Sequence, residues 1–403
     1  MKDTQKILNL ASTAGRTLLE NGAEIYRVEE TMERIAGHYG EKGENFFVLS
    51  NGIFTTGESY ANVEFIPIRG ARLDKVVAVN QLSRDIAIKD MSCDEAAEKM
   101  EAIRKMPDKP VWEILAGTVL GCGGFCAIFG GGFSDCAAAM VAGLLMYCFI
   151  LFAGSGMSKI LANICGGIIG TALCLALHQI GFGANLGNMI IGTLIPLIPG
   201  VPFTNGLRDM ANEDYIAGAT RLLDALVVFF CIALGVSLSF IVHSWIAGGM
   251  IQLHGTVTDC VTALFPIQLA AAFIGTAAFA VLFGVPRKYY ITSGLVGMTG
   301  WLVYLLCLRF TPLSVVGGTF CAATVVAFSS RICAVKLRCP STVFIICGIF
   351  PLIPGAGVFW SSYYTVSAQL SAALGAGFTA VKVTIAIVLG LIVAMNIPRK
   401  RKN

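Results

Sequence analysis

Two copies of one short motif carry the backbone chemistry best suited to binding a solute. Residues 196–200 read Pro-Leu-Ile-Pro-Gly, and residues 351–355 repeat that sequence 155 positions later. Proline lacks a backbone N–H and clashes with the preceding helical turn, so each copy predicts a broken helix inside an apolar segment. Freed carbonyl groups accept from an ammonium group, and the N–H groups of a restarting helix attract a carboxylate. The motif positions are Pro196, Pro199 and Gly200, and Pro351, Pro354 and Gly355.

This pairing predicts a path for a small zwitterionic or anionic solute. Broken backbone inside a membrane is tolerated only where protein or a polar cavity covers it. The alternative is two proline kinks that serve only helix packing.

Polar side chains follow both copies. Asn205, Arg208 and Asp209 follow the first, and Ser361 and Tyr363 follow the second. Arg208 is a candidate for holding a substrate carboxylate, with Asp209 orienting it. Alternatively, Arg208 and Asp209 lie in a cytoplasmic loop and only mark topology. Because the side chains differ, we expect the two copies to contribute unequally to one central site.

Few ionisable groups lie in the apolar part of the chain. Asp224 is the best placed, a few residues into an apolar span. A carboxylate in a membrane span is a functional candidate, and its expected role here is to carry a proton. The alternative for Asp224 is an interfacial salt bridge to Arg221.

The densest cluster of charges lies at residues 20–30. Glu20 and Glu24 are spaced one helical turn apart, as are Glu29 and Glu33. A carboxylate pair could do acid–base work, whereas the alternative is a solvated helix face with i,i+4 pairing. His38 stands alone, so we expect no metal site. The 14 cysteines show no metal-ligand or redox spacing and are predicted to be free thiols, and no cofactor is expected.

The composition divides the chain into a charged N-terminal part and an apolar membrane part. The chain is 56% apolar and 13% charged with 45 glycines, which fits an integral membrane protein. Of the 25 acidic residues, 18 lie in residues 1–110, which predicts a soluble domain over 1–108. The basic residues form no stripe, so nucleic acid is excluded as a partner. The first 25 residues lack an apolar core, and we expect no cleaved signal peptide.

The front domain is predicted to be α+β. Apolar residues recur at helical spacing over residues 4–36, with Gly22 interrupting the run. Residues 46–53 and 61–68 are rich in β-branched and aromatic residues, with turn residues at 51–52 and 56–58, and predict a small antiparallel sheet. A helix is predicted over 73–89, and Ser92 is predicted to cap another that ends near Lys105.

Ten apolar spans of suitable length follow. Basic residues concentrate in alternate connections, which predicts that both the N-terminal domain and the tail are cytoplasmic. The basic positions are Lys159, Arg208, Arg221, Arg287, Lys288, Arg331, Lys336 and Arg338, with residues 399–402 in the tail. The other connections hold Arg309, and Lys382 lies just inside the last span. The spans cover about residues 112–129, 133–153, 160–180, 186–203, 220–243, 266–284, 290–308, 312–330, 341–358 and 380–397.

The second five spans repeat the first five. Residues 232–235 correspond to 387–390 at the same 155-residue offset, and residues 125–130 correspond to 279–284. Five is odd, so the halves must enter the membrane in opposite directions, as in the inverted repeats of secondary transporters. The predicted parts are a first repeat over 109–245, an external loop over 246–265, and a second repeat with a basic tail over 266–403.

The chain resembles the bacterial threonine/serine exporter family. The residues that carry the resemblance are Gly22, Glu24, Arg27 and Glu29, the turn at 50–54 and residues 196–208. Residues from about 266 through 351–364 resemble the smaller membrane half of that family. The halves are separate chains in some relatives, including a pair that exports succinate, and are fused here. The resemblance implies a ten-helix exporter of the bacterial inner membrane, driven by the proton gradient, with a cytoplasmic N-terminal domain.

We therefore expect a secondary exporter of threonine or serine that uses both broken helices and couples to protons through Asp224. No Walker-type phosphate loop occurs, so ATP is not expected as the direct energy source. One alternative is a dicarboxylate exporter, in which Arg208 would matter more. A hydrolase in the front domain would use Glu24 or Glu29, and a regulatory or assembly role for that domain is compatible with export. The expected partners are a small solute and the lipid bilayer, and a homo-oligomer is left open.

Overall fold

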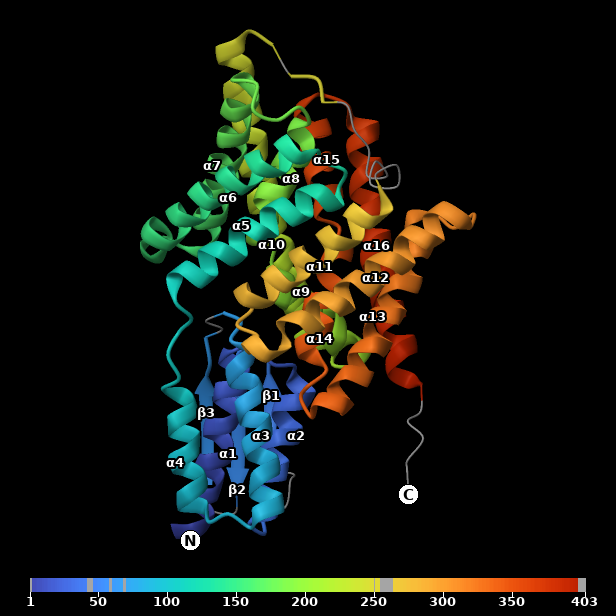
Figure 1. The fold of residues 1–403 in the computed structure, drawn as a ribbon. Coiled ribbons are helices and arrows are strands. Elements are labelled where there is room, and N and C mark those ends of the chain that lie inside the picture. The colour runs from blue at the N-terminus through green and yellow to red at the C-terminus, as the bar shows by residue number, and fades with distance from the viewer. Residues whose placement is uncertain are drawn as a thin grey trace.

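The computed structural model describes residues 2–41, 46–57, 60–67, 70–249, 251–253 and 264–397. The described chain forms a small N-terminal domain and a larger helical part, which lies above the domain in Figure 1. Residues 1, 42–45, 58–59, 68–69, 250, 254–263 and 398–403 are not described. The predicted turn and strand ends at 58 and 68, most of the predicted external loop and the basic tail therefore lie outside the described residues.

The N-terminal domain packs four helices around a three-stranded antiparallel sheet of order β1-β2-β3. Val48 faces Ile53 across the first pair of strands, and both side chains are buried against the helices. This confirms the predicted α+β domain. Its elements are α1 (Lys2–Glu20), α2 (Ile25–His38), β1 (Phe46–Leu49), β2 (Gly52–Gly57), β3 (Tyr60–Phe65), α3 (Leu73–Lys89) and α4 (Cys93–Arg104).

The long N-terminal helix is interrupted at residues 21–24. Gly22 has a φ of +82°, a conformation that glycine adopts without steric cost, and α2 starts anew at Ile25. Glu20 therefore ends one helix and Glu24 precedes the next, so the prediction that they share a helix face is wrong. Ser92 accepts from the Glu95 N–H at 3.3 Å and caps α4 as predicted.

The helical part consists of two series of α-helices in the same order, which differ in the places of the short 3-10 helices η1 and η4. The first series comprises α5 (Val111–Ile128), α6 (Phe133–Ala153), η1 (Gly154–Gly156), α7 (Lys159–Gln179), α8 (Leu186–Leu194), η2 (Ile195–Leu197), α9 (Gly200–Ala211) and α10 (Tyr215–Ala247). The second comprises α11 (Phe265–Leu282), η4 (Arg287–Tyr289), α12 (Tyr290–Phe310), α13 (Val315–Leu337), α14 (Thr342–Ile349), η5 (Phe350–Leu352), α15 (Gly355–Val366) and α16 (Leu370–Asn396).

Nine helices in the described residues are long and apolar enough to cross a membrane. The pair Leu186–Leu197 and Gly200–Ala211, bent by 70°, makes a tenth crossing if it counts as one span. The protein is thus a multi-pass membrane protein, consistent with the ten predicted spans. Helix α9 extends to Ala211, well beyond the predicted end at 203, so Arg208 and Asp209 lie in a helix, and the loop alternative for them is wrong.

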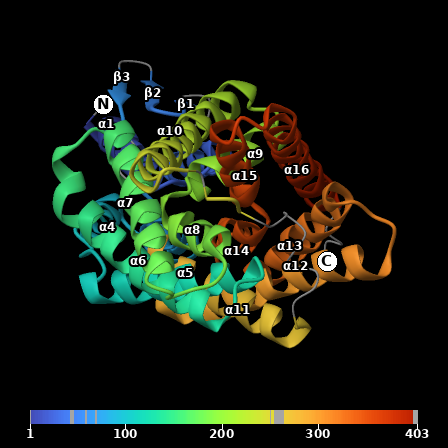
Figure 2. The ribbon, with the colours of Figure 1, turned by 90° about the horizontal axis from the view of Figure 1, so that it is seen from above.

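The two series pack in matching ways. Helix α7 packs on α10, and α13 packs on α16. The closest approaches are at Gly235, where an added Cβ would lie 2.5 Å from the Ile164 carbonyl oxygen, and at Gly390, where it would lie 2.8 Å from that of Phe320. These two glycines are 155 positions apart. The series also interlock, because α10 contacts α15 and α16 contacts α9, and Figure 2 shows α9 and α15 between the two long helices.

Candidate functional site

The two broken helices cross at their breaks. A Cβ added to Gly200 would clash with the ring of Phe350, and one added to Gly355 would lie 2.5 Å from Ile198 Cδ1. Each glycine thus lets the other motif approach, at matched positions of the two series. The structure brings the predicted motif residues together in the middle of the helical part.

The same local hydrogen bonds form each break. Residues 195–197 tighten into a 3-10 turn, in which the Ile198 N–H donates to the Ile195 carbonyl at 3.0 Å. At the second break the Ile353 N–H donates to the Phe350 carbonyl at 3.2 Å. Helices restart at Gly200 and Gly355, immediately after the second proline of each motif. The prolines produce this geometry because they cannot donate to a continuing helical ladder.

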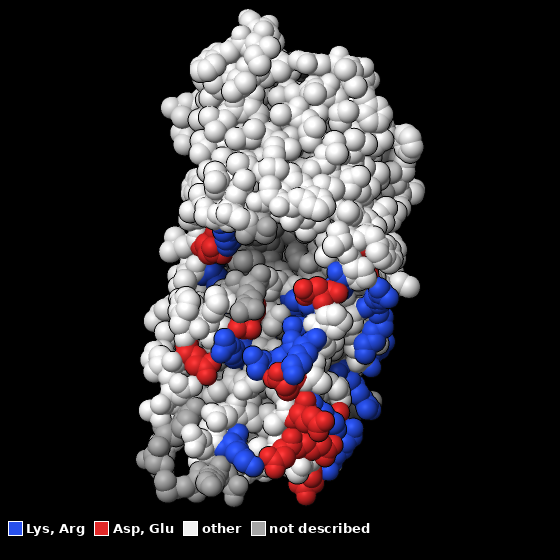
Figure 3. Space-filling model, turned by 90° about the vertical axis from the view of Figure 1, so that its left-hand side faces the viewer, with Lys and Arg blue, Asp and Glu red and all other residues white. Residues whose placement is uncertain are grey.

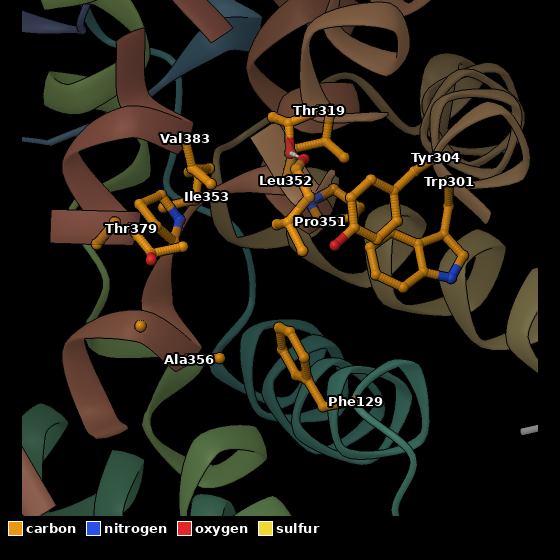
Figure 4. Close-up of a pocket in the computed structure, with 14 residues that line it drawn as sticks. Phe129, Trp301, Tyr304, Thr319, Pro351, Leu352, Ile353, Ala356, Thr379 and Val383 are labelled. Carbon is orange, nitrogen blue, oxygen red and sulfur yellow. Dashed lines mark hydrogen bonds between the residues drawn. The ribbon is translucent and has the colours of Figure 1, made fainter. Parts of the chain in front are cut away.

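The second break is packed closed. Pro351 and Pro354 line a cavity of about 40 Å³, with the aromatic side chains of Phe129, Trp301 and Tyr304 among its walls (Figure 4). The rings of Trp301 and Tyr304 stack with their centroids 4.8 Å apart. Such a volume accommodates only water-sized molecules. No amino acid fits at this break in the observed conformation.

The first break borders a much larger cavity of about 760 Å³, at the junction with the N-terminal domain. On the face seen in Figure 3, charged residues gather over the N-terminal domain and its junction with the helical part, and the surface is hollowed between the two. The motif residues Leu197 and Pro199, and Asn205 after the motif, line this junction cavity. The other lining residues are Gly22, Ser50, Asn51, Phe65, Ile66, Pro67, Gly70, Ala71, Lys159, Asn163, Val201, Pro202, Thr220, Arg221, Asp224 and Val228.

A buried ionic cluster joins the N-terminal domain to both broken helices. The Glu24 carboxylate accepts from the Arg208 guanidinium and from the Thr342 hydroxyl, and Arg208 Nη1 lies 2.9 Å from Thr342 Oγ1. Arg208 lies near the end of α9, and Thr342 is the first residue of α14. Glu24 is 1% exposed, so the prediction of a solvated face is wrong for this residue.

The charge state of Glu24 follows from its surroundings. Burial acts to raise the pKa of this carboxyl, but the Arg208, Arg27 and Arg221 cations and the Thr342 hydroxyl outweigh burial and hold the pKa below its ordinary value. The carboxylate is therefore ionised when the domain is docked, and Arg27, 4.0 Å from Glu24, supports that state.

A second set of contacts holds the backbone of residues 22–25. Asp209 pairs with Arg221 at 2.6 Å rather than with Arg208, and Arg221 also donates to the Ala23 carbonyl at 2.9 Å. The Asn205 amide donates to the Gly22 carbonyl at 2.6 Å, and the Ile25 N–H donates to Asp209. This turn is therefore fixed between α9 and α10.

The N-terminal domain also caps a helix of the second series. The N–H groups of Leu73 and Asp74 donate to the carbonyl groups of Phe283 and Gly284 at 3.2 and 2.8 Å. Gly284 has a φ of +67°, and an added Cβ there would lie 3.0 Å from Arg72 Cα. The end of α11 is satisfied by the domain, which gives docking a second anchor.

Asp224 and Glu29 lie outside the Glu24 cluster. Asp224 pairs with Lys159 at 2.6 Å and not with Arg221, so the expected alternative partner is wrong. Glu29 accepts from the Val48 N–H at 3.2 Å, and burial raises the pKa of its carboxyl. Both groups have structural partners.

The polar residues after the second break lie at the far end of the helical part. Ser361 donates to the Ala373 carbonyl at 3.0 Å. The Tyr363 hydroxyl donates to the Ile251 carbonyl at 2.9 Å and accepts from the Leu253 N–H at 2.8 Å. Tyr363 thereby holds residues 251–253 against α15.

Comparison with known proteins supports an assignment to one family. Residues 9–243 match a family model described as "Putative threonine/serine exporter", and residues 268–397 match a second, described as "Threonine/Serine exporter, ThrE". The "Threonine/serine exporter" of Corynebacterium glutamicum is 23% identical over 398 residues, covering 94% of this chain and 79% of the relative. A Mycobacterium tuberculosis protein named "Probable threonine/serine exporter" is 23% identical over 407 residues, covering 96% and 76%. No solved structure matches the chain.

Proposed function

Because the chain belongs to the threonine/serine exporter family, we propose that it exports a small hydrophilic amino acid, threonine or serine foremost, across the bacterial cytoplasmic membrane. Export is secondary active transport driven by the proton gradient. The observation that carries the proposal is the junction cavity, which reaches the first break while the second break is closed.

The membrane topology of the proposal is an inverted repeat with both termini in the cytoplasm. The matched order of elements supports duplication, and the basic connections support the orientation. In Figure 1, α9 and α14 lie nearer the N-terminal domain than α8 and α15 do. The two broken helices then run in opposite directions, which is expected if five-span halves were inverted.

In the proposed transport cycle the observed conformation faces the cytoplasm. A solute enters the junction cavity beside Pro199 and Asn205, while packing around Phe350 and the aromatic wall at Trp301 and Tyr304 closes the other route. Alternating access would require the second break to open as the first closes. The crossing of Gly200 and Gly355 couples the two movements, because neither break can shift without displacing the other.

Asp224 is the proposed proton carrier. Its side chain is 44% exposed in the junction cavity, so it can exchange a proton with the cytoplasmic side. Lys159 donates to both oxygens of this carboxylate, at 2.7 and 2.6 Å. In this proposal, coupling depends on competition between Lys159 and a proton for the Asp224 carboxylate.

The decisive experiment measures efflux of labelled threonine from proteoliposomes, with and without an imposed proton gradient. We expect faster efflux with the gradient in the wild type and loss of that acceleration in Asp224→Asn. Equal efflux in both conditions would overturn proton coupling, and a wild-type response in Asp224→Asn would overturn the residue assignment. Labelled succinate in parallel tests the dicarboxylate alternative, in which Arg208, here paired with Glu24, would have to be released.

The proposed role of the N-terminal domain is to position the broken helices from the cytoplasmic side. The support is the Glu24 cluster, which contacts α9 and α14 at once. Its carboxylate is buried and paired, an arrangement that suits a structural contact better than hydrolysis.

A further inference from the structure

We propose that the Lys159–Asp224 pair is the recognition site for the two charges of a zwitterionic substrate, with Lys159 binding the carboxylate and Asp224 the ammonium group. This inference rests on the proposed function and assigns residues to substrate recognition within the junction cavity.

The position and exposure of the Lys159–Asp224 pair allow a ligand to replace each partner. Lys159, the first residue of α7, donates to both carboxylate oxygens of Asp224 on α10, at 2.7 and 2.6 Å. Both side chains line the junction cavity, and 56% and 44% of their surfaces are exposed. An exposed ion pair contributes little to stability, so a ligand can separate the two groups at small cost.

The Arg221–Asp209 ion pair, of which Arg221 lines the cavity, is buried and cannot be separated at small cost. The Arg221 and Asp209 side chains are 4% and 1% exposed, and Arg221 also holds the Ala23 carbonyl. Separating them would leave buried charges without partners, which is strongly unfavourable. Arg221 is therefore fixed in the structure, whereas Lys159 and Asp224 are available to a ligand.

A zwitterion replaces this pair without leaving a charge uncompensated. Its ammonium group takes the place of Lys159 at Asp224, and its carboxylate takes the place of Asp224 at Lys159. A dicarboxylate would satisfy Lys159 but bring like charge to Asp224, and a simple amine would leave Lys159 alone. Discrimination arises from the unpaired or repelled charge in each wrong complex.

A third polar group of the cavity supports a ligand with additional donors. The Asn205 side chain is 2% exposed, and its NH₂ group is fixed by donation to the Gly22 carbonyl. That bond orients the amide, so its oxygen is the remaining polar atom, and within the described part of the chain this oxygen has no hydrogen-bond partner. A buried acceptor without a donor is costly, and a ligand hydroxyl or ammonium group would satisfy it.

The test uses the full-length protein in detergent and measures binding, so that variants defective in transport remain informative. The ligands are threonine, threonine methyl ester, which lacks the carboxylate charge, and 2,3-dihydroxybutanoate, which lacks the ammonium group. In the wild type we expect threonine to bind at least tenfold more tightly than either analogue. Lys159→Gln should weaken threonine about tenfold and leave the methyl ester unchanged, whereas Asp224→Asn should weaken threonine and leave dihydroxybutanoate unchanged.

Lys288→Gln is the matched control, because Lys288 is an exposed cation that lies over the Tyr289 ring and does not line the junction cavity. It should keep all three affinities. Equal weakening of all ligands in Lys159→Gln and Asp224→Asn, or unchanged threonine binding in both, would overturn the inference while leaving export intact. Absence of threonine binding and transport in the wild type would overturn the proposed function itself.

Discussion

The two broken helices share a backbone and differ in what holds their second segments. Arg208 in α9 and Tyr363 in α15 occupy positions 155 apart, yet Arg208 binds a buried carboxylate of the N-terminal domain and Tyr363 binds the backbone of residues 251–253. Helix α9 is thus held by an ion pair, and α15 is held by neutral hydrogen bonds.

This difference shows that packing between the breaks constrains the motif residues, whereas the neighbours of α9 and α15 determine the side chains beyond them. The Pro-Leu-Ile-Pro-Gly breaks are alike because each must pack against the other, as the contacts of Gly200 and Gly355 show. The side chains beyond the breaks meet different neighbours, so the same position holds a guanidinium in one copy and a phenol in the other. The charged residue, Arg208, lies in the copy that the N-terminal domain covers, where it is buried.

The largest expected effect comes from removing the charge at the α9 end. Glu24→Gln leaves Arg208 buried without a counter-ion, which typically costs about 3–5 kcal/mol. We expect a lower unfolding temperature and faster proteolysis of the N-terminal domain. Glu30→Gln is the control, since its pair with Arg34 is partly exposed, at 39% and 28%, and should cost at most about 1 kcal/mol. Equal effects in the two variants would contradict the importance of the buried cluster.

The next prediction tests whether the crossing of the breaks is symmetric. Gly200→Ala would place a methyl group against the buried Phe350 ring, at a cost of about 1–3 kcal/mol. Gly355→Ala meets only the flexible end of Ile198 and should cost less. Gly375→Ala, where nothing lies within 4 Å, should leave thermal stability unchanged or raise it. A larger loss of unfolding temperature in Gly355→Ala than in Gly200→Ala would reverse the expected order.

A smaller effect is expected at the α15 end. Tyr363→Phe removes two neutral hydrogen bonds to residues 251–253, each worth about 1 kcal/mol, and keeps the ring packing. Hydrogen exchange should increase at Leu253 while the N-terminal domain keeps its protection. Tyr364→Phe, a neighbouring ring on the same helix, is the control. Loss of protection in the N-terminal domain would show that the two ends are not independent.

The smallest effect is expected from changing pH. The pKa of Glu24 is held below its ordinary value of 4.5, so its contribution to docking is complete above that value and is lost as pH falls through the lowered pKa. The contribution of Glu24 to docking should therefore be constant between about pH 8 and pH 6. Thermal unfolding of wild type and Glu24→Gln should differ by the same amount across that range and converge only in stronger acid. A difference that shrinks near pH 6 would contradict the ionised cluster.

Local features were predictable from the sequence, and long-range partners were not. The breaks, the helix over 73–89 and the Ser92 cap follow from proline, periodicity and capping, which act within a few residues. Arg208 is predicted to hold a substrate carboxylate, but in the structure it binds Glu24, which lies 184 residues away, and no local pattern indicates that contact.

Sequence proximity also misled the prediction for Asp224. Arg221 lies three positions before it, yet the ion pair forms with Lys159, 65 residues away, because Arg221 is directed to Asp209 and Ala23. Thr342 was not singled out at all. It belongs to no charge pattern or motif in the sequence, and its role depends on the contact with Glu24 in the folded chain.

The Glu24 cluster also bears on how the chain is made. The N-terminal domain leaves the ribosome first, but its carboxylate completes its hydrogen bonds with Thr342, which is synthesised 318 residues later. Until α9 and α10 have been inserted, the turn at residues 22–25 presents an uncovered acidic group and the unpaired carbonyl groups of Gly22 and Ala23. Until α14 has been inserted, Glu24 also lacks the Thr342 hydroxyl. The full set of contacts therefore requires helices of both series, and a product truncated before α9 would expose this turn to chaperones and proteases.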